Sequence, residues 1–162
     1  MRREDIEIMA PAGSYESLQA AIQAGAGSVY FGAGNLNMRS RSSFNFTLDD
    51  LETIVQKCRK HDIKTYLTVN AVLYNEDLEE MRRIIDTAKS SGITAIIASD
   101  IAAIQYARSV GMEVHISTQL NVSNIESLKF FAGFGDVVVL ARELNLEQIR
   151  EITKAIRKEN IA

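Results

Sequence analysis

The sequence predicts an α/β fold in which parallel strands form a TIM-type (β/α) barrel, and three observations support this prediction. Short β-rich runs alternate strictly with longer amphipathic stretches, a pattern typical of strands joined by helices in a parallel sheet. Polar and apolar side chains alternate within the strand-like segments Lys64–Asn70 and Glu113–Gln119. A doubly wound sheet has helices on both faces and needs near-continuous apolar strands, whereas a barrel lumen accepts a polar row near its mouth. The length of 162 residues corresponds to one domain.

The alternation gives six β/α units. The strands are expected at Ile6–Met9, Ser28–Phe31, Lys64–Val69, Thr94–Ala98, Glu113–Ser117 and Val137–Leu140. The helices are expected at Tyr15–Ala24, Leu48–His61, Glu76–Ser90, Ile101–Ser109, Ile125–Gly133 and Leu146–Lys158.

Capping residues mark where these helices begin and end. Ser14, Thr47, Ser123 and Asn145 are good N-cap residues, and Ser123 with Glu126 has the spacing of a capping box. Glycines follow three of the helices, at the place where a left-handed residue commonly ends one. These glycines are Gly25, Gly92 and Gly111.

Six units fall short of the eight that close such a barrel in roughly 200 residues or more. We therefore expect an incomplete barrel, with residues 1–162 forming a single domain that is the N-terminal fragment of a longer protein. The alternative is that a partner completes the barrel. An open parallel sheet leaves an exposed edge, so self-association through that edge is also expected.

Composition excludes several classes of protein. Hydrophobic residues make up 46% of the chain and the formal net charge is −3, which excludes a strongly basic nucleic-acid binder but not a local basic patch. Cys58 is the only cysteine, so an intrachain disulfide and a cysteine-only metal site are excluded. No apolar run approaches the ~18 residues that suggest a membrane span, and no signal-peptide pattern is present. We expect a cytoplasmic protein without a membrane partner.

In a barrel of this type, reactive groups gather where the strands end. Those positions carry amides, carboxylates and a guanidinium, and a long loop over Gly32–Phe46 adds Arg39 and Arg41. Guanidinium groups match carboxylate or phosphate oxygens, so the set suits an anionic or hydrogen-bonding ligand. The alternative is local: Asp100 as a helix cap, and Arg142 with Glu143 as an ion pair.

Familiar catalytic motifs are absent. The segment Gly25–Tyr30 precedes a strand, so it is not a dinucleotide-binding loop, and there is neither a Gly-x-Ser-x-Gly nor a His-Glu-x-x-His pattern. Cys58 and His61 share a helix, but at the wrong end of the unit for a barrel active site. His115 is expected in the lumen, where a lone histidine is more often a hydrogen-bonded core residue than a base.

Seven segments, in register along the chain, resemble the N-terminal domain of the collagenase-like peptidase family, peptidase family U32. They are Glu7–Gly13, Ser28–Gly32, the loop residue Arg39, Tyr66–Asn70, Ser99-Asp100, His115–Asn121 and Val139–Leu144. The resemblance implies a (β/α) barrel that is part of a longer protein. It also implies a set of substrate-binding residues at the mouth, without assigning a catalytic residue or a metal ligand. These are Glu7, Tyr30, Arg39, Asn70, Asp100, Gln119, Asn121, Arg142 and Glu143.

The family resemblance leaves three functions open. One is an enzyme domain for iron–sulfur-dependent hydroxylation of tRNA or rRNA bases, binding a small acidic ligand or RNA. An iron–sulfur cluster would then belong to the full-length protein, because Cys58 matches no ligand position and this chain holds no cofactor itself. The second is a peptidase or collagenase, as the family is named, although neither an activated nucleophile nor a metal-ligand set is present. The third is a non-catalytic binding domain.

Overall fold

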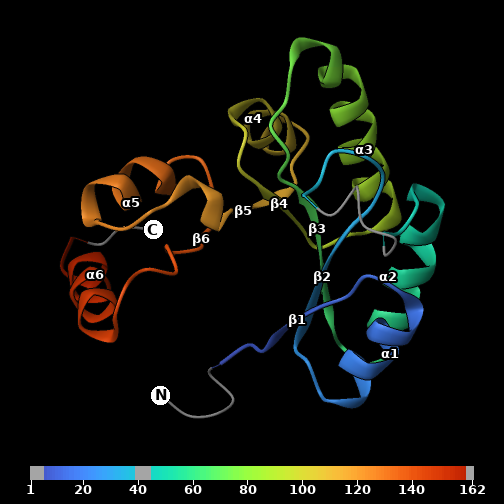
Figure 1. Ribbon diagram of the computed structural model, residues 1–162, viewed down its shortest axis with the longest axis horizontal. Helices are drawn as coiled ribbons and strands as arrows, with labels where there is room; N and C mark the ends of the chain where they lie inside the picture. Colours follow the sequence, from blue (N-terminus) through green and yellow to red (C-terminus); the bar gives the residue numbers. More distant parts are fainter. Residues whose placement is uncertain (1–5, 39–44, 160–162) are drawn as a thin grey trace.

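Six parallel strands form one sheet in the order β1-β2-β3-β4-β5-β6, which confirms the predicted fold class (Figure 1). The structure is a computed structural model, and it describes residues 6–38 and 45–159. The strands are β1 (Met9–Pro11), β2 (Ser28–Gly32), β3 (Lys64–Val69), β4 (Ala95–Ala98), β5 (Glu113–Ile116) and β6 (Val137–Val138). The α-helices are α1 (Tyr15–Gln23), α2 (Leu51–Arg59), α3 (Leu78–Ser91), α4 (Ile101–Ser109), α5 (Ile125–Ala132) and α6 (Leu146–Glu159). Short 3-10 helices precede α2, α3 and α5: η2 (Leu48–Asp50), η3 (Asn75–Asp77) and η4 (Thr118–Leu120).

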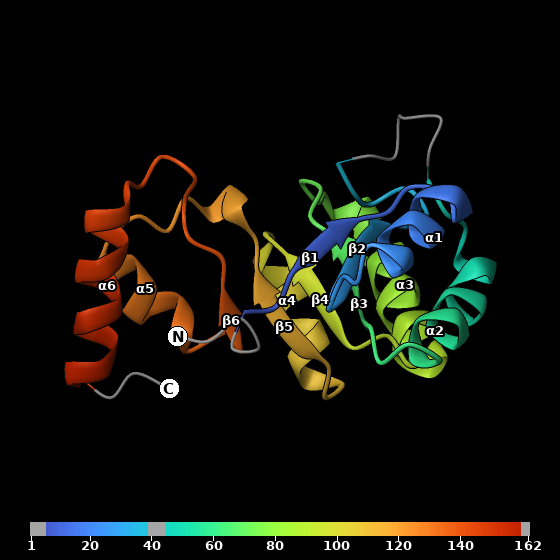
Figure 2. The same ribbon diagram turned by 90° about the horizontal axis from the view of Figure 1, so that it is seen from below.

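Each strand presents one row of side chains to the helices. Val29 and Phe31 of β2 belong to this row, as do Ile96 of β4 and Ile116 of β5, and all four are fully buried. In Figure 2, α1 to α4 lie along that side of the sheet, whereas α5 and α6 lie together beside β6. The continuous apolar core therefore sits between the strands and the helix layer, and the alternate row of each strand faces the other way.

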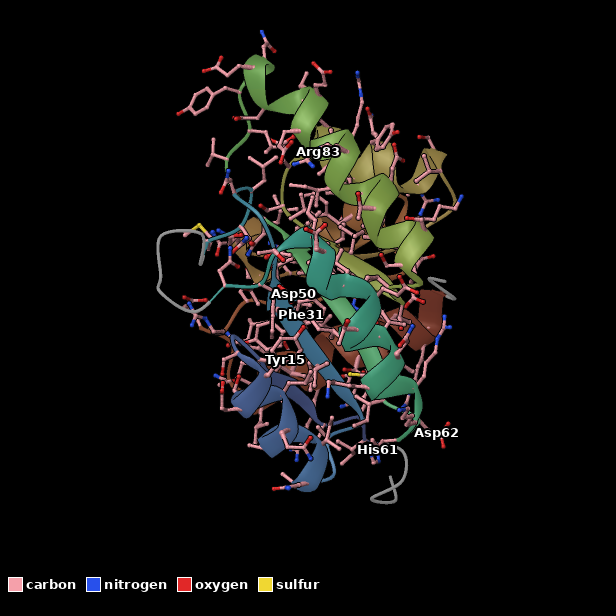
Figure 3. All side chains as sticks on the ribbon, turned by 90° about the vertical axis from the view of Figure 1, so that its right-hand side faces the viewer. Tyr15, Phe31, Asp50, His61, Asp62 and Arg83 are labelled. Atoms are coloured by element: carbon pink, nitrogen blue, oxygen red, sulfur yellow. The ribbon has the colours of Figure 1, made fainter. Side chains whose placement is uncertain are left out.

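Aromatic contacts fix the segment that returns from the long loop after β2. The ring of Phe46 makes edge contacts with Phe31 at 5.5 Å and with Tyr15 at 5.4 Å between ring centroids. The Tyr15 hydroxyl donates to Asp50 Oδ1 at 2.7 Å, and this hydrogen bond raises the pKa of Tyr15 to about 12. Figure 3 shows Tyr15, Phe31 and Asp50 together between α1 and α2. Both ends of the loop are thereby held against the core, because Ala33 also pairs with Phe46.

Most of the predicted capping residues lie at the helix ends where they were expected. The Ser14 hydroxyl accepts from Ser17 N at 3.3 Å, and Asn145 Oδ1 accepts from Gln148 N at 2.9 Å. Gly92 ends α3 with φ +80°, the left-handed conformation that glycine adopts without a steric cost.

One predicted cap is wrong by one residue. Asn124, not Ser123, caps α5: its side chain accepts from Ser127 N at 3.0 Å, so no Ser123–Glu126 capping box forms. The reason is the path of the preceding chain, where Val122 is buried and its carbonyl accepts from Ala141 N at 2.9 Å. That bond holds Val122 beside the segment after β6, and the helix begins at Ile125 as predicted, with Asn124 as its cap.

Strands β2, β4 and β5 differ from their expected ranges by one residue at one end, and β1 and β6 differ by more. β1 begins at Met9 instead of Ile6, because Ile6 and Ile8 are exposed and the ladder with β2 starts at the pair Met9 and Ser28. β6 ends at Val138 instead of Leu140, because the chain then leaves β5 to bond with Val122. Both shortened strands lie at the edges of the sheet, so neither has a second neighbour among the described residues.

Candidate functional site

The row of side chains that faces away from α1 to α4 forms the lumen of the half-barrel. Register pairs place Tyr30 beside Tyr66, Thr68 beside Ile97, and Ile97 beside His115. Tyr66 and Ile97 form a small buried cluster with Ala95, separate from the core beneath the helices, and Tyr30 packs against it. The polar alternation that predicted a barrel therefore marks the lumen face.

A cavity of about 430 Å³ opens at the carboxyl-terminal ends of the strands. Residues on each of the six strands or within four residues after it line the cavity: Met9, Tyr30, Thr68, Asn70, Ile97, Ser117, Thr118, Val139 and Arg142. Because edge residues from both β1 and β6 share this cavity with the central strands, the sheet must curl around it. The apolar members form part of the wall, and the amide, hydroxyl and guanidinium groups supply hydrogen-bonding capacity.

A second hollow of about 340 Å³ adjoins the first. Thr118 and Arg142 line both hollows, and Gln119, Asn121 and Glu143 line only the second. Every lining residue of the second hollow is polar, in contrast to the mixed wall of the lumen cavity. Arg142 is thus the charged group that the two spaces share.

Loop hydrogen bonds hold the mouth in place. Asn70 Oδ1 accepts from Met38 N at 3.3 Å, which ties the end of β3 to the start of the loop after β2. The Ser99 hydroxyl donates to Asn70 O at 3.2 Å and joins the end of β4 to the same point. After β5, the Ser117 hydroxyl accepts from Gln119 N at 3.4 Å, and Asn121 ends η4 with φ 50°.

The structure brings together six of the nine predicted site residues. Tyr30, Asn70 and Arg142 line the lumen cavity, and Arg142 joins Gln119, Asn121 and Glu143 at the second hollow. Asp100 instead acts as the N-cap of α4, where Oδ1 accepts from Ala102 N at 2.8 Å. Arg39 lies outside the described residues.

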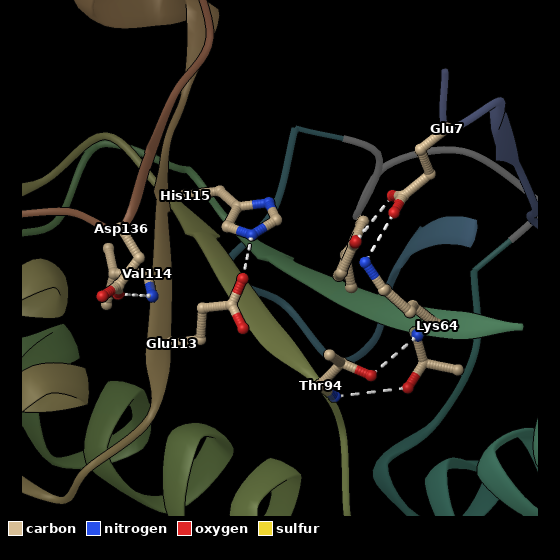
Figure 4. Close-up of polar contacts among 9 residues, drawn as sticks. Glu7, Lys64, Thr94, Glu113, Val114, His115 and Asp136 are labelled. Carbon is tan, nitrogen blue, oxygen red and sulfur yellow. Dashed lines mark hydrogen bonds and ion pairs between the residues drawn. The ribbon is translucent and has the colours of Figure 1, made fainter. Parts of the chain in front are cut away.

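Glu7 is the clear correction, because it lies at the opposite end of the sheet. It precedes β1, and its carboxylate binds Lys64 Nζ at 2.7 Å and the Tyr66 hydroxyl at 2.7 Å, near the start of β3 (Figure 4). Burial acts to raise the pKa of Glu7, but the hydrogen bonds from Lys64 and Tyr66 outweigh it and lower this pKa to about 2. Burial and the neighbouring carboxylate both raise the pKa of the Tyr66 hydroxyl.

The same end of the lumen contains His115, which is 5% exposed. Its Nε2 lies 2.8 Å from Glu113 Oε1, and its ring packs on Tyr66 with 4.6 Å between centroids. The histidine was expected in the lumen, and the structure places it there. These residues form a polar layer beneath the lumen cavity.

Several lining residues were missing from the predicted set. Thr68 and Ser117 lie on the polar row that the alternation of β3 and β5 already marked, so that signal was available. Ile97 and Val139 are apolar residues in short apolar runs, and only the tertiary structure shows which of these face the lumen.

Neither a metal centre nor the cysteine Cys58 supplies hydrolytic chemistry in the described part of the chain. No group of three or more His, Cys, Asp or Glu side chains there could hold a metal ion. Cys58 is fully buried in the helix-facing core, and burial raises the pKa of its thiol to about 11, so it is neither a nucleophile nor a ligand. An iron–sulfur cluster needs several cysteine thiolates, and the residues of this chain do not fit one. Across residues 6–38 and 45–159, no helix has the length and apolar character needed to cross a membrane.

Comparison with known proteins gives the family. The sequence profile of peptidase family U32 matches residues 13–161. The chain belongs to peptidase family U32. It is similar to a solved U32 peptidase, Mk0906, with a TM-score of 0.74 and 13% identity over 91% of this chain and 64% of that one. A deoxyribose phosphate aldolase from Aeropyrum pernix has a TM-score of 0.67 at 12% identity, covering 96% of this chain and 70% of the other. At these identities the likeness concerns the fold alone.

Curated relatives within this family carry two kinds of name. A Porphyromonas gingivalis protein named collagenase is 59% identical over 99% of this chain and 39% of its own length. The tRNA hydroxylation protein P1 of Bacillus subtilis is 33% identical over 93% of this chain and 36% of its length. The 23S rRNA 5-hydroxycytidine C2501 synthase of Escherichia coli is 32% identical over 93% of this chain and 23% of its length. This chain therefore spans well under half of each relative.

Proposed function

We propose that this U32 barrel is the ligand-binding domain of a protein that hydroxylates tRNA or rRNA bases in the cytoplasm. The observation that carries the proposal is the lumen cavity, which contains a guanidinium, an amide and hydroxyl groups, while the described residues include no cluster of side chains that could hold a metal ion. Binding and positioning groups are what a domain needs when the oxidative chemistry is supplied elsewhere. Two relatives named for RNA hydroxylation support the same choice.

In this proposal Arg142 is the anchor of an anionic group, either the carboxylate of a small ligand or an RNA phosphate. A guanidinium presents a rigid fork of donors that matches such oxygens. Asn70 and Ser117 orient the bound group through hydrogen bonds, and the apolar wall formed by Tyr30 and Ile97 excludes water from it. The iron–sulfur cluster expected for such a protein would be ligated outside this chain, since Cys58 does not fit that role.

The proposal is tested in Escherichia coli lacking its own 23S rRNA 5-hydroxycytidine C2501 synthase. The protein that carries this barrel is expressed there, and 5-hydroxycytidine in 23S rRNA and hydroxylated nucleosides in tRNA are measured by mass spectrometry. Restored hydroxylation that Arg142→Ala reduces at least tenfold, with Arg150→Ala on exposed α6 as the matched control, supports the proposal. The absence of hydroxylated nucleosides from both RNA classes contradicts it.

A collagenase is the second candidate, favoured by the 59% identity to the Porphyromonas gingivalis protein of that name. The same purified protein is incubated with collagen in the presence and absence of a chelator. Collagen cleavage that persists through purification would replace the first proposal. A protein that binds a ligand through Arg142 but performs neither reaction would be a binding domain.

A further inference from the structure

His115 lies in the layer of side chains directly beneath the lumen cavity. It lies two residues before Ser117 on the same face of β5, and its lateral neighbour on β4 is Ile97; Ser117 and Ile97 both line the cavity. Residues two apart in a strand are separated by roughly 7 Å. A water bound beside Ser117 would bridge a spacing of this size between the ring and a ligand in the cavity.

The ring is held in one orientation by two independent contacts. Nε2 lies 2.8 Å from Glu113 Oε1, and the ring packs on Tyr66 at an interplanar angle of 59°. No residue in the described ranges 6–38 and 45–159 forms a hydrogen bond with Nδ1, the second ring nitrogen. Figure 4 shows Nε2 directed at Glu113 and the other ring nitrogen directed away from it.

Of the charged residues near the ring, Glu113 is the one that contacts it, because the others bind different partners. Glu7 faces the cluster from the segment before β1, but its carboxylate is engaged by Lys64 and Tyr66 of β3. Asp136, in the turn before β6, accepts from Val114 N at 2.8 Å through Oδ2. Glu113 itself is 43% exposed at the side chain, so it connects the buried imidazole to solvent at the amino-terminal end of the lumen.

We propose that His115 and Glu113 form a pair that transfers a proton from a ligand bound in the lumen cavity. Nδ1 takes a proton from an O–H or N–H group of the ligand, through a water, and the bonding electron pair stays on the ligand atom. The imidazolium that forms donates its Nε2 proton to the Glu113 carboxylate in a hydrogen bond that stabilises the charge. The proton returns to the product or leaves to solvent through Glu113. This inference depends on the proposed function in one respect: both place the ligand in the lumen cavity.

The first test is the ring tautomer, which depends on no assay of function. Long-range nitrogen–proton NMR spectra of the chain labelled with ¹⁵N-histidine report both ring nitrogens, with exposed His61 as the internal reference. We expect the neutral ring of His115 to carry its proton on Nε2 by a factor of about ten or more, because a charge-assisted hydrogen bond favours that form. Glu113→Gln should reduce this preference, whereas Glu126→Gln should not. A ring protonated mainly on Nδ1 cannot accept the proton there and overturns the proposal.

The second test separates proton transfer from a structural role. In the RNA hydroxylation assay with the complete protein, His115→Gln keeps a polar side chain of similar size beside Glu113. We expect kcat to fall about 100-fold, the lower range for general acid–base catalysis, with KM unchanged within twofold. Glu113→Gln should lower kcat by a smaller factor, which keeps the test valid if the His115 variant folds poorly. A folded His115→Gln protein with unchanged kcat refutes the pair. If no RNA is hydroxylated but the tautomer is as expected, only the proposed function fails.

Discussion

The polar cluster at the amino-terminal end of the lumen predicts a pH-dependent contribution to stability that one substitution removes. Glu7→Gln preserves side-chain volume but removes the charge that binds Lys64 Nζ and the Tyr66 hydroxyl, each at 2.7 Å. These bonds join the segment before β1 to β3, across the intervening strand β2. We therefore expect the variant to fold with a lower free energy of unfolding at neutral pH.

The magnitude follows from the pKa of the Glu7 carboxyl, which is lowered from its ordinary 4.5 to about 2. Complete conversion of that difference gives at most about 3 kcal/mol. Solvent screens the pair, however, because the Glu7 side chain is 36% exposed and the Lys64 side chain 56% exposed. The expected loss is therefore about 1 kcal/mol at pH 7, or about 3 °C in Tm for a domain of this size.

The sign of the pH dependence is fixed by the direction of the shift. A carboxyl group whose pKa is lowered by folding stabilises the folded state above its unfolded pKa of 4.5, and this stabilisation is lost as pH falls toward 2. Wild type and Glu7→Gln should differ by about 1 kcal/mol in urea unfolding at pH 7, and this difference should shrink to a small fraction by pH 2.5, close to the folded pKa of about 2. Glu143→Gln, an exposed change at the other end of the sheet, is the control. Equal differences at pH 7 and pH 2.5 would refute the electrostatic explanation.

Three further predictions follow from single contacts. Asn124→Ala should lower the free energy of unfolding by about 1 kcal/mol through loss of the bond to Ser127 N, whereas Ser123→Ala should leave it nearly unchanged, as measured by urea denaturation. Cys58, fully buried and with its pKa raised to about 11, should react with a thiol reagent only at the rate of unfolding. Val137→Lys on the exposed edge strand β6 should reduce the self-association expected of the open sheet, as measured by sedimentation velocity.

The order of strands and helices could be predicted because it rests on local signals that agree with one another. β3 over Lys64–Val69 and α4 over Ile101–Ser109 have the predicted ranges. Each has a clear hydrophobic period, and residues at its ends favour termination. The curvature of the sheet also had a local signal, the polar row within β3 and β5, because only a lumen accepts such a row.

The predictions that were wrong concern residues whose roles depend on contacts between distant segments. Ser123 and Asn124 are both good capping residues, and a bond from Ala141 to Val122 decides between them. The prediction that Glu7 lies at the mouth was wrong for a geometric reason. The segment Glu7–Gly13 runs along a whole strand, and seven residues in extended conformation cover roughly 20 Å. The first and last residues of the segment therefore belong to opposite ends of the sheet.

The placement of polar groups at the mouth of the lumen limits which ligands can bind there together. Among the described residues that line its mouth, the guanidinium is that of Arg142, placed where the lumen cavity and the adjoining polar hollow meet. Two ligands that bound in these spaces would therefore compete for, or share, the same donors, and occupancy of one would alter affinity for the other. A small anion in the lumen and a hydrogen-bonding partner on the rim can both contact Arg142, because its five donors form a fork. In the function proposed above, Arg142 would then contact a small anionic ligand and a second ligand on the rim at the same time.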